Sequence, residues 1–207
     1  LAIVMENGEM FIEENTLIAI SDYVLGRTPG NTVSNLSSSR GLRDVTEKHN
    51  CTYHAAAVGE VNVVTKMKEV DAVIGGEGNG GVIYPALHYG RDALVGVALF
   101  LTLMARSGKS VSEIKASLPA YAIAKNKIQL TPDIDVDAIL AAVKKKYADE
   151  KVTDIDGVKI DFPTSWVHLR KSNTEPIIRI YSEAPTMEEA EKLAESIKSV
   201  INEIKAC

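Results

Sequence analysis

Residues 75–81 form a glycine-rich segment that follows directly after the apolar run 72–74. Glycine lets a ligand approach the backbone closely, and Glu77 and Asn79 within the segment offer acceptors and donors suited to sugar hydroxyls. A dinucleotide-binding loop is one alternative, but that motif needs a helix after the glycines, whereas a strand is predicted at 82–84. A plain flexible turn is the other alternative, and residue chemistry alone leaves it open.

A second polar segment, residues 170–176, reads Arg-Lys-Ser-Asn-Thr-Glu-Pro. Arginine offers a planar fork matched to phosphate oxygens, and Ser, Asn and Thr add hydroxyl, amide and backbone N–H donors within a short span. The residues that we assign to phosphate binding are Arg170, Ser172, Asn173, Thr174 and Arg179. The alternative is that this segment is an ordinary turn and that Arg179 is an exposed strand residue.

The size of these interactions indicates that the phosphate segment does not act alone. Three or four charge-assisted hydrogen bonds contribute about 1.5–3 kcal/mol each, which is comparable with the roughly 4–15 kcal/mol of freedom lost on association. We therefore expect the glycine segment to hold a sugar while the phosphate segment holds its phosphate, with one domain closing on the other.

Several single residues are weaker candidates for ligand contacts. Glu60 lies at a predicted strand-to-helix turn and could accept a hydrogen bond from a sugar hydroxyl, although an acidic residue in a first helical turn also complements the helix dipole. Arg40 could reach an anion or be a solvated charge at a helix start. His88 and Arg91 could line an interdomain cleft, and Asp92 is predicted to cap a helix.

Strands and helices of about ten residues alternate in the first part of the chain, which favours a right-handed parallel α/β layer with ligands beyond the carboxyl ends of the strands. The loops 37–40, 58–60 and 75–81 are expected to converge there. An Asn-Gly pair at residues 7 and 8 predicts a hairpin, and Asn15 is predicted to cap the first helix. Strands are predicted at 32–36, 52–56 and 72–74, and helices end near residues 25, 49, 70, 108 and 117.

The alternation stops near residue 118, and consecutive strands then lie between two helices. The sequence therefore predicts two domains: a three-layer α/β/α domain with a mixed sheet at 1–118, and a smaller α+β domain with an antiparallel sheet at 119–207. Predicted elements of the second domain are strands at 121–130, 152–155, 158–162, 166–169 and 177–181, and helices at 136–147 and from 186 onward.

Composition excludes several classes of protein. The chain has 207 residues, of which 45% are apolar and 25% charged, as in ordinary globular proteins. It contains no apolar run of the roughly 18 residues that cross a bilayer, and its net charge of −5 argues against general nucleic-acid binding. Two cysteines are too few for a disulfide framework, which favours a reducing cytoplasm. Because the first residue is Leu1, we expect the natural start to lie upstream.

The two polar segments, in this order, resemble the third and fourth domains of the α-D-phosphohexomutases, the superfamily of phosphoglucomutase, phosphomannomutase and phosphoglucosamine mutase. The resemblance covers essentially the whole chain. Residues 170–176 are similar to the phosphate-binding loop of that superfamily almost letter for letter. Residues 76–81 are similar to its sugar-binding loop Gly-Glu-x-Ser-Gly-His, with Asn79 in place of Ser and Gly81 in place of His. The resemblance implies sugar contacts by Glu60, Glu77, Asn79 and Gly81.

The resemblance also implies a reaction. In that superfamily, hexose 1-phosphate and hexose 6-phosphate interconvert through a phosphoserine in the first domain and a hexose 1,6-bisphosphate intermediate. Mg²⁺ held by an Asp-x-Asp-x-Asp-Arg loop in the second domain assists the transfer. Neither motif occurs here, and the serines at 37–39 fit a turn better than a nucleophile.

We therefore expect no catalytic residue and no metal ligand in this chain, and no turnover by the chain alone. Its expected partners are a small phosphosugar and the N-terminal domains of the same enzyme. The alternative is a non-catalytic phosphosugar-binding module. The sequence does not distinguish glucose, mannose and glucosamine phosphates, because they share the groups that these segments could contact.

Overall fold

The computed structural model describes residues 1–129, 135–172 and 177–205. The chain divides into two compact units, Leu1–Ala120 (unit 1) and Tyr121–Cys207 (unit 2). Each unit has its own sheet and its own buried apolar clusters.

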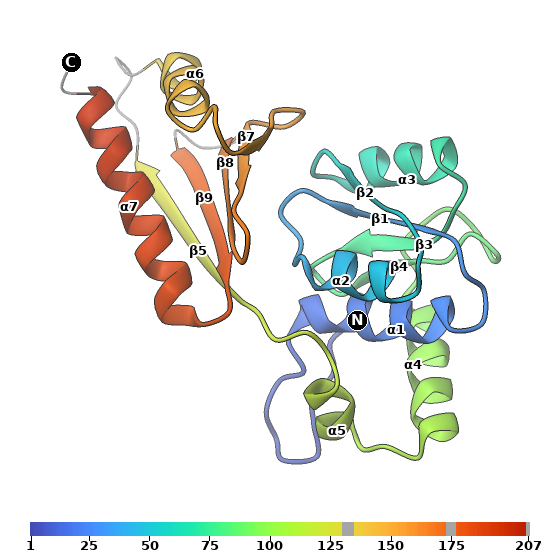
Figure 1. Cartoon of the computed structure of the whole chain (residues 1–207). Helices are drawn as coiled ribbons and strands as arrows, with labels where there is room; N and C mark the ends of the chain where they lie inside the picture. The colour runs from blue at the N-terminus through green and yellow to red at the C-terminus, as the bar shows by residue number, and fades with distance from the viewer. Residues whose placement is uncertain (130–134, 173–176, 206–207) are drawn as a thin grey trace. The chain divides into compact units, whose positions relative to one another are not determined.

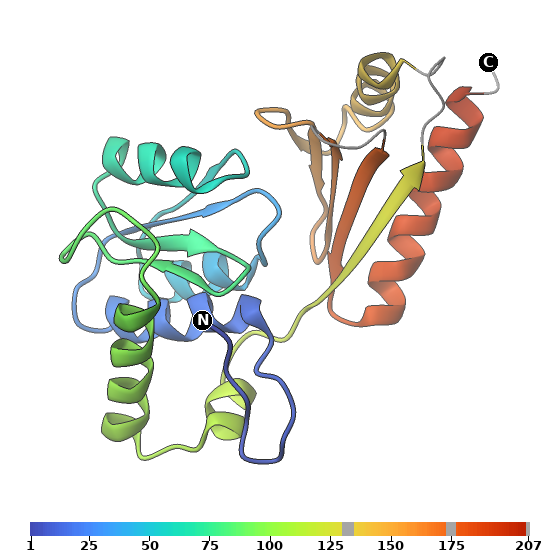
Figure 2. The same ribbon diagram turned by 180° about the vertical axis from the view of Figure 1, so that it is seen from behind.

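Unit 1 is a three-layer α/β/α domain with a mixed sheet, as predicted (Figure 1). The sheet order is β2-β1-β3-β4, in which β1 is parallel to β2 and β3, and β4 is antiparallel to β3. One face packs on α1 and α2, and the opposite face packs on α3, as the view from behind also shows (Figure 2). The elements are α1 (Glu13–Leu25), β1 (Asn31–Asn35), α2 (Gly41–Lys48), β2 (Tyr53–Ala56), α3 (Glu60–Glu69), β3 (Ala72–Glu77), β4 (Gly81–Ile83), α4 (Ala93–Ser107) and α5 (Val111–Ala116).

The glycine-rich segment is a tight hairpin rather than the long loop that the sequence predicts. Strand β3 continues through Glu77 and pairs with β4, so that only residues 78–80 lie in the turn. Gly76 and Gly81 let the two strands approach closely: a Cβ atom built on Gly76 would lie 2.0 Å from the carbonyl oxygen of Gly81. The pattern of glycines therefore reflects backbone contact within the hairpin as well as access for a ligand.

The start of unit 1 differs from the prediction. The Asn-Gly turn closes a single bridge between Val4 and Met10, and no longer strand forms around it. Helix α1 begins at Glu13, so the predicted cap, Asn15, lies inside the helix. Burial of Phe11 in the core fixes the chain just before the helix, and this tertiary contact outweighs the local capping preference. Asp92 caps α4 as predicted, accepting hydrogen bonds from the backbone N–H groups of Leu94 and Val95.

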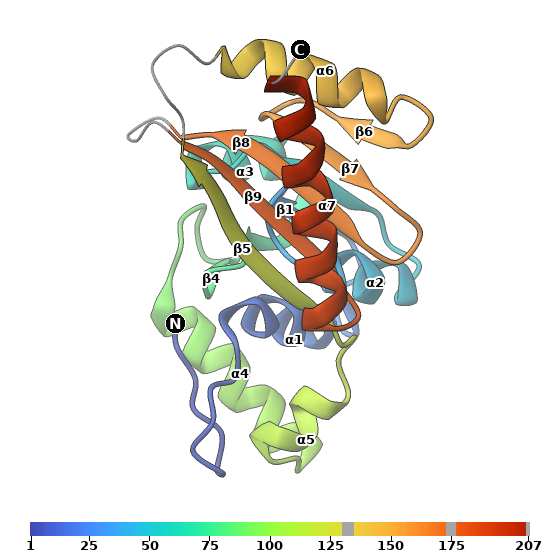
Figure 3. The same ribbon diagram turned by 90° about the vertical axis from the view of Figure 1, so that its left-hand side faces the viewer.

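Unit 2 is an α+β domain with an antiparallel sheet of order β5-β9-β8-β7-β6, as predicted. Figure 3 shows α7 running along β5 and β9. Thr186 and Glu189 form the predicted capping box before α7. The elements are β5 (Ala122–Gln129), α6 (Val136–Lys146), β6 (Lys151–Thr153), β7 (Val158–Asp161), β8 (Trp166–Lys171), β9 (Ile177–Ala184) and α7 (Met187–Lys205).

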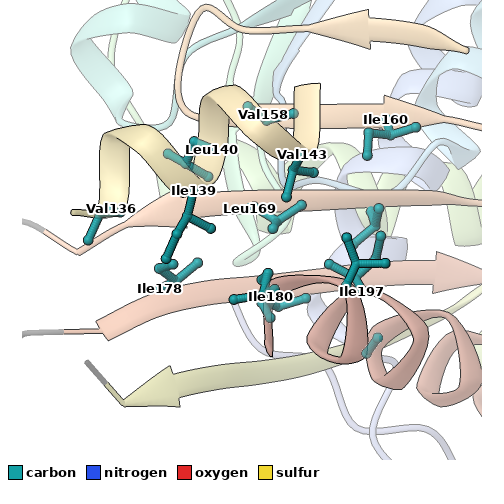
Figure 4. Close-up of a cluster of buried hydrophobic side chains, with 14 residues drawn as sticks. Val136, Ile139, Leu140, Val143, Val158, Ile160, Leu169, Ile178, Ile180 and Ile197 are labelled. Atoms are coloured by element: carbon teal, nitrogen blue, oxygen red, sulfur yellow. The ribbon is translucent and has the colours of Figure 1, made fainter. Parts of the chain in front are cut away.

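Helices α6 and α7 cover one face of this sheet. Ile139 of α6 and Ile197 of α7 point toward Leu169 and Ile180 of the central strands (Figure 4). Successive side chains of a strand point to opposite faces, so the neighbours of these apolar residues lie on the face away from the helices. That second face carries the arginines of the predicted phosphate segment.

Candidate functional site

In unit 1, Glu77 ties together the carboxyl ends of the three parallel strands. The residue is 6% exposed, and Oε1 of its carboxylate accepts hydrogen bonds from Nδ2 of Asn35 (2.6 Å) and from the backbone N–H of Gly59 (3.0 Å). Asn35 ends β1, and Gly59 follows β2. The loops that the sequence predicts to converge after β1, β2 and β3 therefore meet at this carboxylate.

The serine-rich turn after β1 supports the same junction. Oδ1 of Asn35 accepts hydrogen bonds from the backbone N–H of Ser37 (2.9 Å) and from Oγ of Ser38 (3.0 Å). Oγ of Ser38 in turn accepts from the backbone N–H of Gly78 (2.8 Å). These contacts give Ser38 a role in holding the glycine hairpin, in agreement with the interpretation of this segment as a turn.

A cavity of about 460 Å³ lies beside the hairpin. Its walls are residues 79–82, Glu60 at the start of α3, residues 91–93 at the start of α4, and Leu1. Oδ1 of Asn79 accepts from the backbone N–H of Gly81 (3.1 Å), which fixes the turn at the cavity wall. Of the predicted sugar-binding residues, Glu60, Asn79 and Gly81 therefore share this cavity, whereas Glu77 is buried in the adjacent junction.

Glu60 pairs with Arg91, a relationship that the sequence analysis missed. Oε1 of Glu60 accepts from the backbone N–H of Arg91 (2.9 Å), and Oε2 accepts from its Nε (2.7 Å). These hydrogen bonds, with the backbone N–H first, lower the pKa of Glu60. The two residues are 31 positions apart, so only the tertiary fold brings them together.

The other candidates of unit 1 have different surroundings. Nε2 of His88 lies 3.0 Å from Oδ2 of Asp92, and this contact, together with the amides of the helix start, lowers the pKa of Asp92. His88 is thus held against the helix cap. Arg40 directly precedes α2 and lies outside the residues that line the cavity.

In unit 2, Arg170 and Arg179 are brought directly opposite each other. The register of β8 and β9 pairs Arg170 with Arg179, and Lys171 with Ile178. Both arginines are half-buried and lie on the face away from the helices. Nη1 of Arg170 is also 3.8 Å from Oδ2 of Asp156.

A third cation, Lys127, continues this row. The register of β5 and β9 places Lys127 opposite Arg179, so Lys127, Arg179 and Arg170 lie side by side on three neighbouring strands. The sequence signal for Lys127 is its alternation with the apolar residues of β5, but no local feature links it to the other two. Like charges placed directly opposite one another repel, and an anion would relieve this repulsion.

The loop after Arg170 is closed by backbone pairing, because the N–H of Ser172 donates to the carbonyl oxygen of Ile177 (3.0 Å). Asn173 and Thr174 lie outside the described residues. The structure thus brings Arg170, Arg179 and Ser172 to one end of the β8–β9 hairpin.

A buried polar group adjoins the cation row on the same face. Nε2 of His168 donates to the carbonyl oxygen of Asp156 (2.6 Å), and burial is the main cause that lowers the pKa of His168 to about 4. Nε1 of Trp166 donates to Oε1 of Glu183 (2.6 Å), and Nζ of Lys159 lies 4.4 Å from the Trp166 ring centroid. His168 is therefore neutral at neutral pH, and the positive charge of this face comes from lysine and arginine.

Comparison with known proteins gives the family. Residues 13–121 match the family described as phosphoglucomutase/phosphomannomutase, alpha/beta/alpha domain III, and residues 126–200 match its C-terminal domain. The chain belongs to the phosphoglucomutase/phosphomannomutase family.

A curated member of this family, the phosphoglucomutase/phosphomannomutase of Thermococcus kodakarensis, is 37% identical to the chain over 196 residues, which cover 92% of the chain and 42% of the relative. A family protein from Burkholderia thailandensis superposes with a TM-score of 0.81 at 20% identity, covering 99% of this chain and 44% of that one. Aspergillus fumigatus N-acetylphosphoglucosamine mutase, solved with GlcNAc-6P and magnesium, superposes with a TM-score of 0.60 at 15% identity over 97% of this chain and 49% of that one. The chain thus spans less than half the length of these relatives.

The described residues of this family member do not fit a magnesium site. Outside the gaps at 130–134 and 173–176 and the last residues, no group of three or more His, Cys, Asp or Glu side chains is arranged to hold a metal ion. In the same described ranges, no helix is long and apolar enough to cross a membrane.

Proposed function

We propose that this chain supplies substrate recognition to a cytoplasmic phosphohexomutase that interconverts hexose 1-phosphate and hexose 6-phosphate. Unit 1 contacts the sugar through Glu60, Glu77, Asn79 and Gly81. Unit 2 contacts the phosphate that is not reacting, through the residues Arg170, Ser172, Asn173, Thr174 and Arg179. We assign these roles to domains of residues 1–118 and 119–207.

The single observation that carries the phosphate assignment is the row of cations on β5, β9 and β8. Arg170 and Arg179 offer planar donor forks from adjacent strands, and Lys127 adds a third positive charge. A phosphate group accepts several charge-assisted hydrogen bonds at once, so it neutralises this row better than water does. The family membership of both units supports the same assignment.

The sugar assignment rests on the cavity beside the hairpin and on the junction at Glu77. Asn79 and Glu60 carry donors and acceptors at the cavity wall. Both hydrogen bonds that the described residues make to the Glu77 carboxylate go to Oε1, which leaves Oε2 to accept a further donor. Polar oxygens and amides of this kind suit hydroxyl groups better than they suit an apolar ligand.

The chemical step would belong to other parts of the longer enzyme. The proposed reaction passes through a phosphoserine and a hexose 1,6-bisphosphate, and Mg²⁺ held elsewhere in the longer enzyme would assist the transfer. This chain contains neither the serine motif nor the Asp-rich motif. Phosphoryl transfer depends mostly on positioning and charge stabilisation. We therefore propose that the chain alone binds phosphosugars but does not interconvert them.

Calorimetric titration of the 207-residue chain tests this function. Glucose 1-phosphate, glucose 6-phosphate, mannose 6-phosphate and inorganic phosphate are the ligands, and Arg170→Gln and Arg179→Gln are the variants. Loss of a charge-assisted hydrogen bond is expected to weaken binding about 10- to 100-fold. Lys145→Gln, an exposed change at the end of α6, is the control and should bind as the wild type does. If both arginine variants bind these ligands as tightly as the wild type does, the phosphate assignment is overturned.

A further inference from the structure

Arg91 is held at the edge of the unit 1 cavity by its own backbone. It forms an antiparallel bridge with Ile83 at the end of β4. The backbone N–H of the next residue, Asp92, donates to the carbonyl oxygen of Val82 (3.0 Å), and the Asp92 side chain caps α4. Arg91 is thus tied to the sheet before it and to a helix after it, so its Cα position is well defined.

Glu60 fixes the side chain of Arg91 through its carboxylate. One carboxylate oxygen accepts from the backbone N–H of Arg91 and the other accepts from its Nε. This arrangement uses Nε, the inner nitrogen of the guanidinium, and leaves the donors Nη1 and Nη2 available to a ligand. Within the part of the chain that the structure describes, neither Nη atom makes a hydrogen bond or an ion pair, and the side chain is 47% exposed at the cavity.

Gly81 provides the space that Arg91 occupies. A Cβ atom built on Gly81 would lie 2.7 Å from Cδ of Arg91, so the stem of the arginine crosses directly over the glycine. In the sugar-binding loop that residues 76–81 resemble, a histidine stands at the position of Gly81. The side chain of Arg91, from a different segment, therefore fills the space beside residue 81 that a side chain there would enter.

We infer that Arg91 contacts the ligand by donating hydrogen bonds from its Nη atoms to hydroxyl oxygens of the sugar, and that Glu60 positions it. This inference rests on the proposed function of unit 1 and reassigns Glu60 from a direct sugar contact to a positioning residue. Both oxygens of Glu60 already accept hydrogen bonds from Arg91, whereas the Nη donors of Arg91 need acceptors.

The charges around the cavity favour hydroxyl oxygens over a phosphate group as the acceptors. The positive charge of Arg91 is balanced by Glu60 at 2.7 Å, and Asp92 adds a second carboxylate to the wall. A phosphate placed here would face both carboxylates, and nearby like charges disfavour a charged group. Neutral hydroxyl groups accept hydrogen bonds from the guanidinium without that repulsion. The cavity volume of about 460 Å³ falls in the usual range for small-ligand sites.

Titration of the full chain with sugar phosphates and with inorganic phosphate tests this inference. The probes are glucose 6-phosphate, mannose 6-phosphate and glucosamine 6-phosphate, with inorganic phosphate as the sugar-free probe. Arg91→Gln removes the fork, and Arg91→Lys keeps the charge but not the paired donors. Arg106→Gln is the matched control, because Arg106 is an exposed arginine in the last turn of α4.

Both Arg91 variants are expected to bind at least one sugar phosphate about tenfold more weakly, as the loss of one or two hydrogen bonds predicts, with inorganic phosphate binding unchanged. Glu60→Gln is expected to weaken sugar phosphate binding as well. If Glu60 acts through Arg91, the double variant Glu60→Gln/Arg91→Gln binds no more weakly than Arg91→Gln alone. A role of Glu60 in folding only would not produce this lack of additivity.

The outcomes separate the inference from the proposed function. If Arg91→Gln binds every sugar phosphate that the wild type binds with the wild-type affinity, the inference is overturned and the proposed function stands. Additive losses in the double variant overturn the positioning role of Glu60. If the wild type binds none of the sugar phosphates, both the inference and the proposed function are overturned.

Discussion

Arg170 of β8 and Arg179 of β9 face each other across neighbouring strands, on the side of the sheet that α6 and α7 leave uncovered. Directly opposed like charges repel in an antiparallel pair, and Oδ2 of Asp156 lies 3.8 Å from Nη1 of Arg170. We propose that this arrangement serves anion binding rather than the stability of the sheet.

We expect the loss of Arg179 to have opposite effects on the stability of unit 2 and on phosphate binding. In phosphate-free buffer, Arg179→Gln should leave the free energy of unfolding of unit 2 unchanged or raise it by up to about 1 kcal/mol. The same change should weaken binding of inorganic phosphate. Fluorescence of Trp166, the only tryptophan of the chain and fully buried in unit 2, reports unfolding in urea. A large loss of stability with unchanged phosphate binding would contradict this account.

Glu77 is expected to matter for the stability of unit 1 before it matters for any ligand. Glu77→Ala removes the acceptor of Asn35 Nδ2 and of the Gly59 N–H, and leaving these donors unsatisfied should cost about 2–4 kcal/mol. Glu77→Gln keeps an oxygen acceptor and should cost less. Urea unfolding followed by far-UV circular dichroism, with amide exchange at Gly59, measures both. Equal stability of the alanine variant and the wild type would show that the junction is not stabilising.

The glycine hairpin should be sensitive to a single methyl group. A Cβ atom on Gly76 would lie 2.0 Å from the carbonyl oxygen of Gly81, so Gly76→Ala should separate β3 from β4 and cost about 3 kcal/mol or more. Gly26→Ala is the control, because its nearest neighbour would be an ordinary contact at 3.5 Å and its φ is −65°. Thermal unfolding of the two variants compares them. Similar stability of the two variants would contradict a close contact between the backbones of Gly76 and Gly81.

His168 predicts a pH dependence of stability in unit 2. Its pKa falls from 6.5 to about 4 in the folded chain, chiefly through burial. The unfolded state therefore binds the proton more readily between these values, and the free energy of unfolding should decrease as pH falls from 6.5 toward 4, by about 3 kcal/mol over the whole window. Carboxylates with lowered pKa values, such as Asp154, act at lower pH.

Urea titrations at pH 7 and pH 5, followed by Trp166 fluorescence, measure how the free energy of unfolding changes with pH. His168→Gln keeps a donor toward the carbonyl oxygen of Asp156 and does not titrate, so its stability should change less between the two pH values. An identical pH dependence in both proteins would show that His168 does not carry the effect.

The sequence predicted most of the architecture because the periodic elements are marked locally. Asp92 and the pair Thr186 and Glu189 form helix starts as their spacing predicts. The exception at Asn15 has a tertiary cause, since burial of Phe11 fixes the chain before the helix.

The candidate site was predictable in residue type but not in pairing. Glycine and polar residues marked both segments, whereas the pairing of Glu60 with Arg91 and the register of Lys127 with Arg179 depend on the fold. Local patterns carry no information on which strands are neighbours. The continuation of β3 through Glu77 was missed for a related reason, because glycines read locally as a turn while strand pairing decides their conformation.

We propose that one hexose phosphate is recognised by residues of both units. Two-dimensional ¹H–¹⁵N spectra of the chain titrated with glucose 6-phosphate test it most directly. We expect that amides near Asn79 and Arg91 in unit 1 and near Arg170 in unit 2 shift along one saturation curve with one Kd. Shifts confined to a single unit, or separate curves with different Kd values, would contradict it.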